Sequence, residues 1–185
     1  LEYDNTMNSQ REVIYTKRNR ALQGDRLKSE IFDLLDEFLD QLIEAHFDNA
    51  EADQIREEML LKLLVDVKIE PEEFEKLGKD GLKNKLLDAA KEFYRRKEEM
   101  LSMELMARLE RYAMLSVIDT KWKEHLREMD DMKEGIGLRA YGQKDPLVEY
   151  KAESFKLFVS LLDQIRNDVV SFAFKFFPHA PAEVS

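Results

Sequence analysis

The chain has 185 residues, enough for one ordinary domain or two small ones. Acidic residues outnumber basic ones by 39 to 29, and the resulting net charge of −10 disfavours nucleic acid as a partner because phosphate backbones are also negative. Cysteine is absent, which excludes disulfides and thiolate metal sites, and no apolar run approaches the roughly 18 residues that span a bilayer. Residues 1–4 do not resemble a signal peptide, so we expect a soluble, cytoplasmic protein without a transmembrane segment.

Apolar residues recur every three or four positions in the first third of the chain, which predicts helices. Residues 1–22 form the first of these, and nothing before them could serve as an N-cap, which indicates that the sequence begins inside a helix. Gly24 ends this helix and Asp25 is expected to cap the next, whose stripe is Leu27, Ile31, Leu34, Phe38 and Leu42. Asn49 is expected to cap a third helix, with Ile55, Met59 and Leu63 turned inward.

One short helix and one long helix are predicted in the middle of the chain. Pro71 fits the first turn of the short helix, and Gly78 and Gly81 end it. The long helix begins near Asp80 and continues through the polar residues 95–99; its first apolar face is Leu82, Leu86, Ala89 and Phe93. A later stripe leads to Gly135 and comprises Leu115, Ile118, Trp122, Leu126 and Met129.

The last part of the chain is predicted to be a loop followed by a heptad-patterned helix. Three glycines and a proline within 135–146 favour a loop there, and Asp145-Pro146 opens the helix as cap and first residue. Its stripe alternates steps of three and four and comprises Phe155, Phe158, Leu162, Ile165, Val169, Phe172 and Phe176. Such a stripe requires a helical partner, and we expect 103–134 as its antiparallel neighbour. We interpret no stretch as having the period-two alternation of a strand, so the predicted fold class is all-α.

No catalytic or metal site is predicted. Gly137 and Gly142 have the spacing of a phosphate-binding loop, but Lys144 comes one place late and no hydroxyl follows it. Neither a Glu-x-x-His pair for a di-iron centre nor a serine on a glycine-flanked elbow is present, so His46, His125 and His179 are interpreted as packing or surface residues. Four methionines fit core filling, which we favour, or an adaptable peptide groove: Met100, Met103, Met106 and Met114.

Two stretches carry residue patterns that are more specific than helical periodicity. The first is Leu1-Glu2-Tyr3-Asp4 followed by residues 7–15 (MNSQREVIY), and the second runs from Ile118 through Trp122-Lys123-Glu124-His125-Leu126 to Glu134-Gly135-Ile136-Gly137-Leu138-Arg139-Ala140-Tyr141-Gly142-Gln143-Lys144-Asp145-Pro146. Together with Tyr94-Arg95-Arg96-Lys97-Glu98-Glu99, they closely resemble the C-terminal region of the SecA family, ATPases that drive preproteins through the bacterial Sec channel. Departures from the family pattern occur at Asn5-Thr6, Met132-Lys133 and Ala140.

The resemblance implies a helical scaffold domain, 1–22 and 103–185, interrupted by a helical wing domain, 23–102. An antiparallel two-helix finger at about 103–150 would contact the translocating polypeptide through its tip, with Arg139, Tyr141, Gln143 and Lys144. Scaffold packing would involve Trp122, Leu126, Phe155 and Phe158.

The implied role is to couple ATP-driven motion of motor domains outside this sequence to preprotein movement, without catalysis by this chain. Implied partners are the SecYEG channel, unfolded preprotein and the SecA motor domains. ATP and Mg would belong to those motor domains, with no cofactor here. The implied location is the cytoplasmic side of the membrane, peripherally bound. Two alternatives remain from the residues alone: a generic coiled-coil scaffold or adaptor, and a bundle metalloenzyme.

Overall fold

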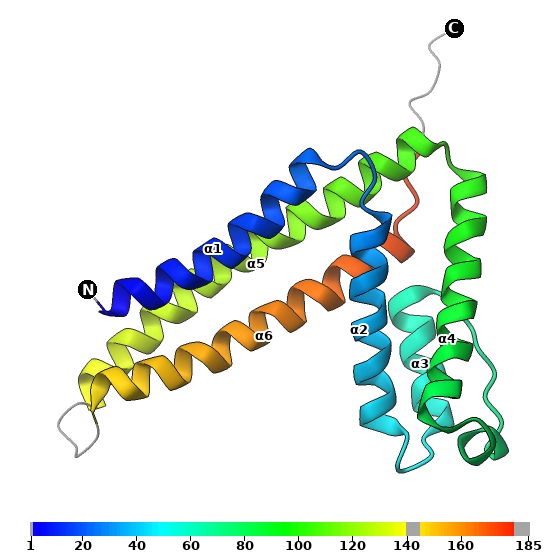
Figure 1. The fold of residues 1–185 in the computed structure, drawn as a ribbon, viewed down its shortest axis with the longest axis horizontal. Coiled ribbons are helices and arrows are strands. Elements are labelled where there is room, and N and C mark those ends of the chain that lie inside the picture. The colour runs from blue at the N-terminus through cyan, green and yellow to red at the C-terminus, as the bar shows by residue number, and fades with distance from the viewer. Residues whose placement is uncertain (1, 140–144, 180–185) are drawn as a thin grey trace, which may run out of the picture. The chain divides into compact units, whose positions relative to one another are not determined.

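The structure, a computed structural model, describes residues 2–139 and 145–179, with the side chain of Arg139 left out. That part of the chain contains helices and no strand, which confirms the predicted all-α class. The helices, shown in Figure 1, are α1 (Glu2–Gln23), α2 (Lys28–His46), α3 (Ala52–Leu63), α4 (Glu72–Met100), α5 (Met103–Arg139) and α6 (Pro146–Lys175).

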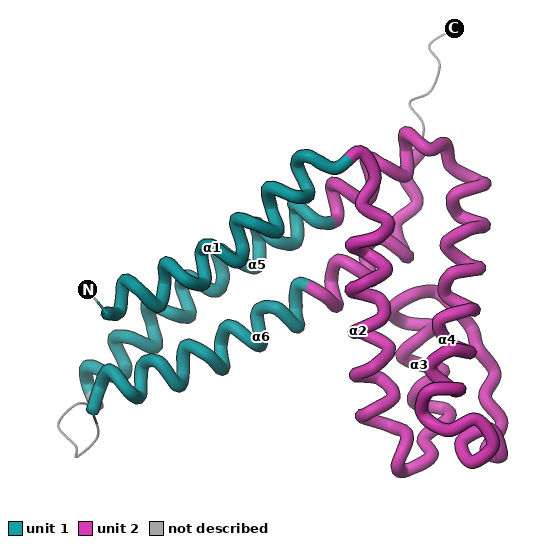
Figure 2. Tube along the Cα trace, in the orientation of Figure 1, with its two compact units in different colours: residues 1–24, 114–165 teal, residues 25–113, 166–185 magenta. Residues whose placement is uncertain are grey.

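The chain divides into two compact units, coloured separately in Figure 2. Unit 1 comprises residues 1–24 and 114–165, and unit 2 comprises 25–113 and 166–185. The helices α5 and α6 therefore each contribute one part to unit 1 and another to unit 2.

In unit 1, α1 packs antiparallel to α5. Arg18 forms an ion pair with Asp119 at 2.9 Å, and nearer the start of α1 the Gln10 Oε1 atom lies 2.7 Å from His125 Nε2. Residue numbers thus rise along α1 while they fall along α5. An isolated helix of 22 residues would be marginal in water, so its stability comes from this packing.

The unit 1 part of α6 runs antiparallel to α5 and parallel to α1. The His125 ring lies 6.1 Å from that of Phe158, and the Tyr150 ring lies 4.6 Å from that of Tyr3. Gln10 donates a hydrogen bond from Nε2 to the Ser154 carbonyl at 3.3 Å. The expected antiparallel pairing of the last two long segments is thus present in this unit.

The loop expected from Gly135 onward is absent from residues 135–139, because α5 continues through Gly135 and Gly137 to Arg139. Each glycine inside a helix costs about 1 kcal/mol relative to alanine. Ile136, between them, is buried against Met129 and Tyr150, and this packing offsets the cost. Gly142 lies outside the described residues.

Unit 2 buries one side of α2 against α3 and α4. Its core includes Leu27, Ile31, Leu35, Phe38, Leu39, Ile55, Met59, Leu63, Leu82 and Leu86. Two predicted caps are wrong: α2 begins at Lys28 with Leu27 at the N-cap position, and α3 begins at Ala52 with Glu51 there. Neither position makes a side-chain cap hydrogen bond, so Asp25 and Asn49 do not act as expected.

The long middle helix is interrupted at two places. Gly78 has φ 69° and ψ −179°, a conformation that favours glycine, and it separates a short first piece of α4 from the rest. The expected continuation of the helix through residues 95–99 is confirmed, and the helix ends at Met100 because Leu101 is extended. The Ser102 hydroxyl then accepts a hydrogen bond from the Leu105 N–H at 3.1 Å and caps α5.

The start of α6 agrees with the prediction, whereas its buried face differs. Asp145 Oδ1 accepts a hydrogen bond from the Leu147 N–H at 3.0 Å, and Pro146 is the first helical residue. The buried positions are Tyr150, Ser154, Leu161, Ile165, Arg166, Val169, Val170, Ala173 and Phe174. Phe155 is 68% exposed, because the contacts of Tyr150 and Ser154 with α1 turn the neighbouring Phe155 outward.

Candidate functional site

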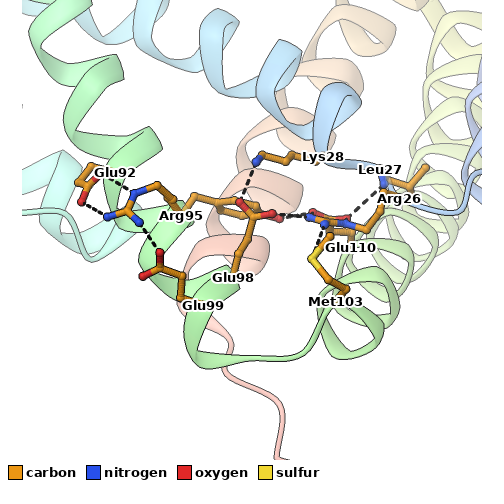
Figure 3. A network of polar contacts seen from close by, with 10 residues as sticks. Arg26, Leu27, Lys28, Glu92, Arg95, Glu98, Glu99, Met103 and Glu110 are labelled. Carbon is orange, nitrogen blue, oxygen red and sulfur yellow. Dashed lines mark hydrogen bonds and ion pairs between the residues drawn. The ribbon is translucent and has the colours of Figure 1, made fainter.

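The carboxylate of Glu110 is the centre of a buried polar cluster in unit 2 (Figure 3). Glu110 lies on α5 and its side chain is 0% exposed. Arg26 donates to both of its oxygens, at 2.7 and 3.0 Å, and the Leu27 N–H donates to Oε1 at 3.2 Å. The Tyr94 hydroxyl, from α4, donates to Oε2. One carboxylate thus joins the segment before α2 to α4 and α5.

Glu98 extends the cluster along the last turns of α4. Its Oε2 accepts a hydrogen bond from Arg26 at 3.0 Å, and its Oε1 accepts one from Lys28 at 2.7 Å. Burial alone would raise the pKa of Glu98, but the hydrogen bonds from Lys28 and Arg26 outweigh it and lower the pKa. The hydrogen bond to Glu110 raises the pKa of Arg26. Glu98 therefore stays ionised, and both carboxylates of the cluster are bound to a cation.

Tyr94 is fixed as a neutral donor. Burial, followed by the nearby negative charge of Glu110, raises the pKa of Tyr94 above its ordinary value. Its ring contacts those of Phe32 and Phe174, with centroids 5.1 and 5.2 Å away. A phenol held between aromatic rings and a carboxylate can donate one hydrogen bond and pack, which is a structural role.

Lys97, three residues after Tyr94, holds the end of α6. Its side chain is 1% exposed, and Nζ donates to the carbonyls of Ala173 at 2.7 Å and Phe174 at 3.1 Å, and also to that of Phe176. The ammonium lies 4.2 Å from the centre of the Phe177 ring. The last carbonyls of a helix have no partner within it and carry partial negative charge, which a lysine satisfies. Burial lowers the pKa of Lys97 to about 8.

Unit 1 contains a second buried polar group, formed without formal charge. Because the Gln10 amide oxygen accepts, His125 Nε2 carries the proton, and its Nδ1 has no partner. The imidazole stacks on Trp122 with centroids 5.4 Å apart. Burial lowers the pKa of His125, so the ring is neutral near pH 7. This histidine is a packing residue, as expected from the sequence.

The described residues offer no site for a metal, since no group of three histidine or acidic side chains is suitably placed among them. His46, the last residue of α2, is partly buried and its Nδ1 lies 3.6 Å from a Glu51 carboxylate oxygen, whereas His179 after α6 is exposed. Within the described ranges, no helix is both long and apolar enough to cross a membrane. The geometry supports the joining of helices, and we find no acid–base or nucleophilic pair in the two clusters.

The site residues expected from the sequence are distributed along α5 and α6. Trp122 is 8% exposed, and Leu126 and Phe158 are partly buried, all in unit 1. Phe155, expected to pack, is exposed instead. Of the finger-tip residues, Arg139 ends α5 without a described side chain, and Tyr141, Gln143 and Lys144 lie outside the described residues. Among the methionines, Met106 and Met114 are buried whereas Met100 and Met103 are exposed.

Sequence reasoning missed the Glu110 cluster. A signal was available in α4, because Ala90, Tyr94 and Lys97 continue the three- and four-residue spacing of Leu82 and Leu86. That spacing places a hydroxyl and an ammonium on the buried face, where each requires a partner. The partners could not be found from spacing, since Glu110 and Arg26 are 84 residues apart in the sequence.

These features define a class of protein: a helical scaffold whose long helices are joined by buried polar contacts. Comparison with known families then places it. A family model described as "SecA Wing and Scaffold domain" matches residues 1–177, and the chain belongs to this family. The chain is similar to the protein translocase subunit SecA of Chloroherpeton thalassium, 55% identical over 183 residues, and to that of Prosthecochloris aestuarii, 53% identical over 181. These alignments cover 99% and 98% of this chain but 18% of each relative, so the chain spans less than a fifth of their length.

Proposed function

We propose that the chain is a non-catalytic part of a preprotein export motor, in which it couples motion of ATP-driven motor domains to movement of a polypeptide. The observation that carries this proposal is the pairing of α1 with α5 and α6 in unit 1, tied by Arg18–Asp119 and Gln10–His125. A segment from the start of the chain and two from its end form one bundle, as a coupling scaffold requires. The similarity to SecA translocase subunits supports the export role.

The finger of this scaffold is proposed to be the hairpin of α5 and α6. Their unit 1 portions run antiparallel, as the Phe158–His125 and Tyr150–Met129 contacts indicate, and only residues 140–145 separate the two helices. We propose that Arg139, Tyr141, Gln143 and Lys144 contact the translocating polypeptide. An aromatic ring with a hydroxyl suits a client of no fixed sequence, because it offers both apolar contact and a hydrogen bond.

The remaining assignments follow the same proposal. Residues 1–22 and 103–185 would be the scaffold domain and 23–102 the wing, a division that differs from the two compact units in where it cuts α5 and α6. The partners would be the SecYEG channel, unfolded preprotein and the motor domains, which would hold ATP and Mg. The assembled protein would bind peripherally at the cytoplasmic face of the membrane.

The test is a chimera in which this chain replaces the matching segment of the Chloroherpeton thalassium subunit, to which it is 55% identical. Tyr141→Ala in the chimera should lower preprotein transport into SecYEG vesicles by about tenfold, the loss of about 1.4 kcal/mol of contact energy, and leave basal ATPase activity unchanged. Tyr141→Trp, which keeps an aromatic ring, is the matched control and should retain most transport.

Two results would contradict the proposal. If the chimera without substitutions failed to bind SecYEG vesicles, a generic scaffold role would be favoured. If Tyr141→Ala left transport normal but lowered the melting temperature of this chain by many degrees, Tyr141 would be a structural residue and the finger-tip role would be wrong.

A further inference from the structure

The connection between α3 and α4, residues 65–70, has the alternation of a β-strand although it belongs to no sheet. Its sequence is Val-Asp-Val-Lys-Ile-Glu, in which apolar and charged residues alternate. The apolar members, Val65, Val67 and Ile69, are buried, and the charged members, 66, 68 and 70, are exposed. In Figure 1 the segment is a smooth trace beside α4, within unit 2. One face of this segment is therefore fixed to the core while the other faces solvent.

The main chain of this segment has few partners. Val65 donates its N–H to the Met59 carbonyl at 3.4 Å, and Glu70 donates its N–H to Glu73 Oε1 at 3.1 Å. Within the described residues, the amides from 66 to 69 donate to no protein acceptor. The Lys68 carbonyl accepts a hydrogen bond from Lys85 Nζ at 2.9 Å, and the Glu70 carbonyl accepts one from the Glu73 N–H at 2.9 Å. Amides on an anchored, extended chain require water or another extended backbone as their partner.

A cavity lies directly beside the second half of this segment. Its volume is about 540 Å³, and residues 68–71 form one wall. The opposite wall is the turn after α2 and the first turn of α3, residues 49–54, which has no side-chain cap. Space for an additional chain therefore adjoins the unpaired main-chain groups.

The charges at the cavity favour a basic occupant. Glu51, Asp53 and Glu70 line it, and the two basic residues that also line it are already bound to carboxylates. Arg56 forms an ion pair with Asp66 at 2.6 Å, and Lys68 one with Glu70 at 3.3 Å. Lysine or arginine on an incoming strand would therefore meet carboxylates that are in excess over cations.

We propose that residues 65–70 form a docking edge for an extended polypeptide that carries basic side chains. The polypeptide adds to this edge as a β-strand, and its side chains enter the cavity beside 68–71. Its carbonyls accept from the amides of Asp66 and Lys68, because successive N–H groups of an extended chain point to opposite edges. The inference rests on the proposed function in one respect, since an unfolded preprotein is the extended chain that an export motor would present. The main-chain hydrogen bonds of this contact would form with any extended polypeptide, and the basic side chains would add a preference among polypeptides.

The test uses this chain alone and a ten-residue peptide of alternating valine and lysine, blocked at both ends so that it has no terminal charge. Saturating peptide should slow amide exchange at Asp66 and Lys68 by about tenfold or more, as expected for amides that gain a hydrogen bond. A peptide with glutamate in place of lysine should bind about fivefold more weakly, and one N-methylated at alternate residues should give no protection, because its pairing edge is blocked.

Lys68→Pro is the matching change in the protein, since proline removes one of the amides. It should weaken peptide binding by about fivefold, whereas Lys68→Ala, which keeps the amide and equally loses the Glu70 ion pair, should bind within about twofold of the unmodified chain. Circular dichroism of each variant verifies the fold. If Lys68→Pro unfolds the chain, the N-methylated peptide still tests the proposal, because it changes the ligand and leaves the protein unmodified.

Three outcomes would overturn the inference: no slowing at Asp66 and Lys68 with saturating peptide, equal binding of the N-methylated peptide, or protection only elsewhere in the chain. Slowing that follows the concentration of the chain without peptide would also overturn it, since a second copy would then occupy the edge. None of these measurements involves the SecYEG channel or Tyr141. If the peptide measurement fails, the proposed export role is therefore unaffected. If the transport measurement with Tyr141→Ala fails, the peptide result is likewise unaffected.

Discussion

Among the described residues, the Glu110 cluster of unit 2 and the Gln10–His125 pair of unit 1 both join helices, and they differ in charge. In unit 2, Glu110 forms an ion pair with a bidentate arginine and also accepts hydrogen bonds from a tyrosine hydroxyl and a backbone amide. In unit 1, Gln10 and His125 share a neutral hydrogen bond beneath Trp122. Removing one member of a buried ion pair leaves an uncompensated charge, whereas removing a neutral partner leaves an unsatisfied dipole. We therefore expect unit 2 to be the more sensitive to single substitutions.

The largest effect is expected for Glu110→Ala. The substitution leaves Arg26, Tyr94 and the Leu27 amide without their shared acceptor, so the free energy of unfolding should fall by about 3–5 kcal/mol. Urea denaturation followed by circular dichroism measures it. Glu92→Ala, at an exposed carboxylate on α4, is the control and should leave the denaturation midpoint unchanged. A loss below about 1 kcal/mol for Glu110→Ala would mean that the cluster is not the main joint of unit 2.

An intermediate effect is expected for Trp122→Ala in unit 1. Trp122 is 8% exposed and covers the His125 ring, so its truncation leaves a cavity and should cost about 3 kcal/mol, the lower end of the range for buried aromatic residues. Because Trp122 is the single tryptophan of the chain, its fluorescence reports on this unit directly. A red-shifted emission from the folded protein would show that the ring is exposed and would reject the predicted loss.

The smallest effect is a pH dependence that distinguishes the clusters. Burial lowers the pKa of His125, so below about pH 6.5 the unfolded state binds protons that the folded state does not. Stability from this site is present above about pH 6.5 and decreases as the pH falls through the lowered folded pKa. The difference in unfolding free energy between the unmodified protein and His125→Gln should therefore shrink between pH 7 and 5.

The same titration has a second window for unit 2. The pKa of Glu98 is lowered from 4.5, so its contribution is present above that pH and is lost only as the pH falls below it. His179→Gln, at an exposed residue after α6, is the control for the histidine window and should show no change in slope. An equal slope for His125→Gln and the unmodified protein from pH 7 to 5 would contradict the lowered pKa of His125.

Much of the fold could be predicted because helical periodicity is a local signal. The inward positions of α3 and the cap of α6 at Asp145 agree with the sequence analysis. The errors occur where tertiary contacts override local preference. Ile136 keeps α5 helical through two glycines, and the packing of Tyr150 and Ser154 rotates α6 so that Phe155 faces outward. A seven-residue repeat does not predict which of two adjacent apolar stripes on a helix will be buried against other helices.

The candidate sites were predictable only in part. Trp122 was expected to be buried from its stripe, and it is. The Glu110 cluster joins residues far apart in the sequence, so no spacing indicates it. The expectation that no stretch alternates with period two is wrong for residues 65–70, whose apolar members are buried and whose charged members are exposed. That the amides of residues 66–69 have no acceptor within the described residues is visible only in the structure.

Lys97 has a mechanical consequence for the end of α6. A pulling force applied to the chain after Phe177 would first act on the three carbonyls that accept hydrogen bonds from Lys97, and only then on the rest of α6. A helix pulled from its end frays one hydrogen bond at a time, but here the ammonium binds the carbonyls of Ala173, Phe174 and Phe176 together. The load would therefore pass through a single side chain into α4, and the last turn of α6 would give way in one step instead of gradually.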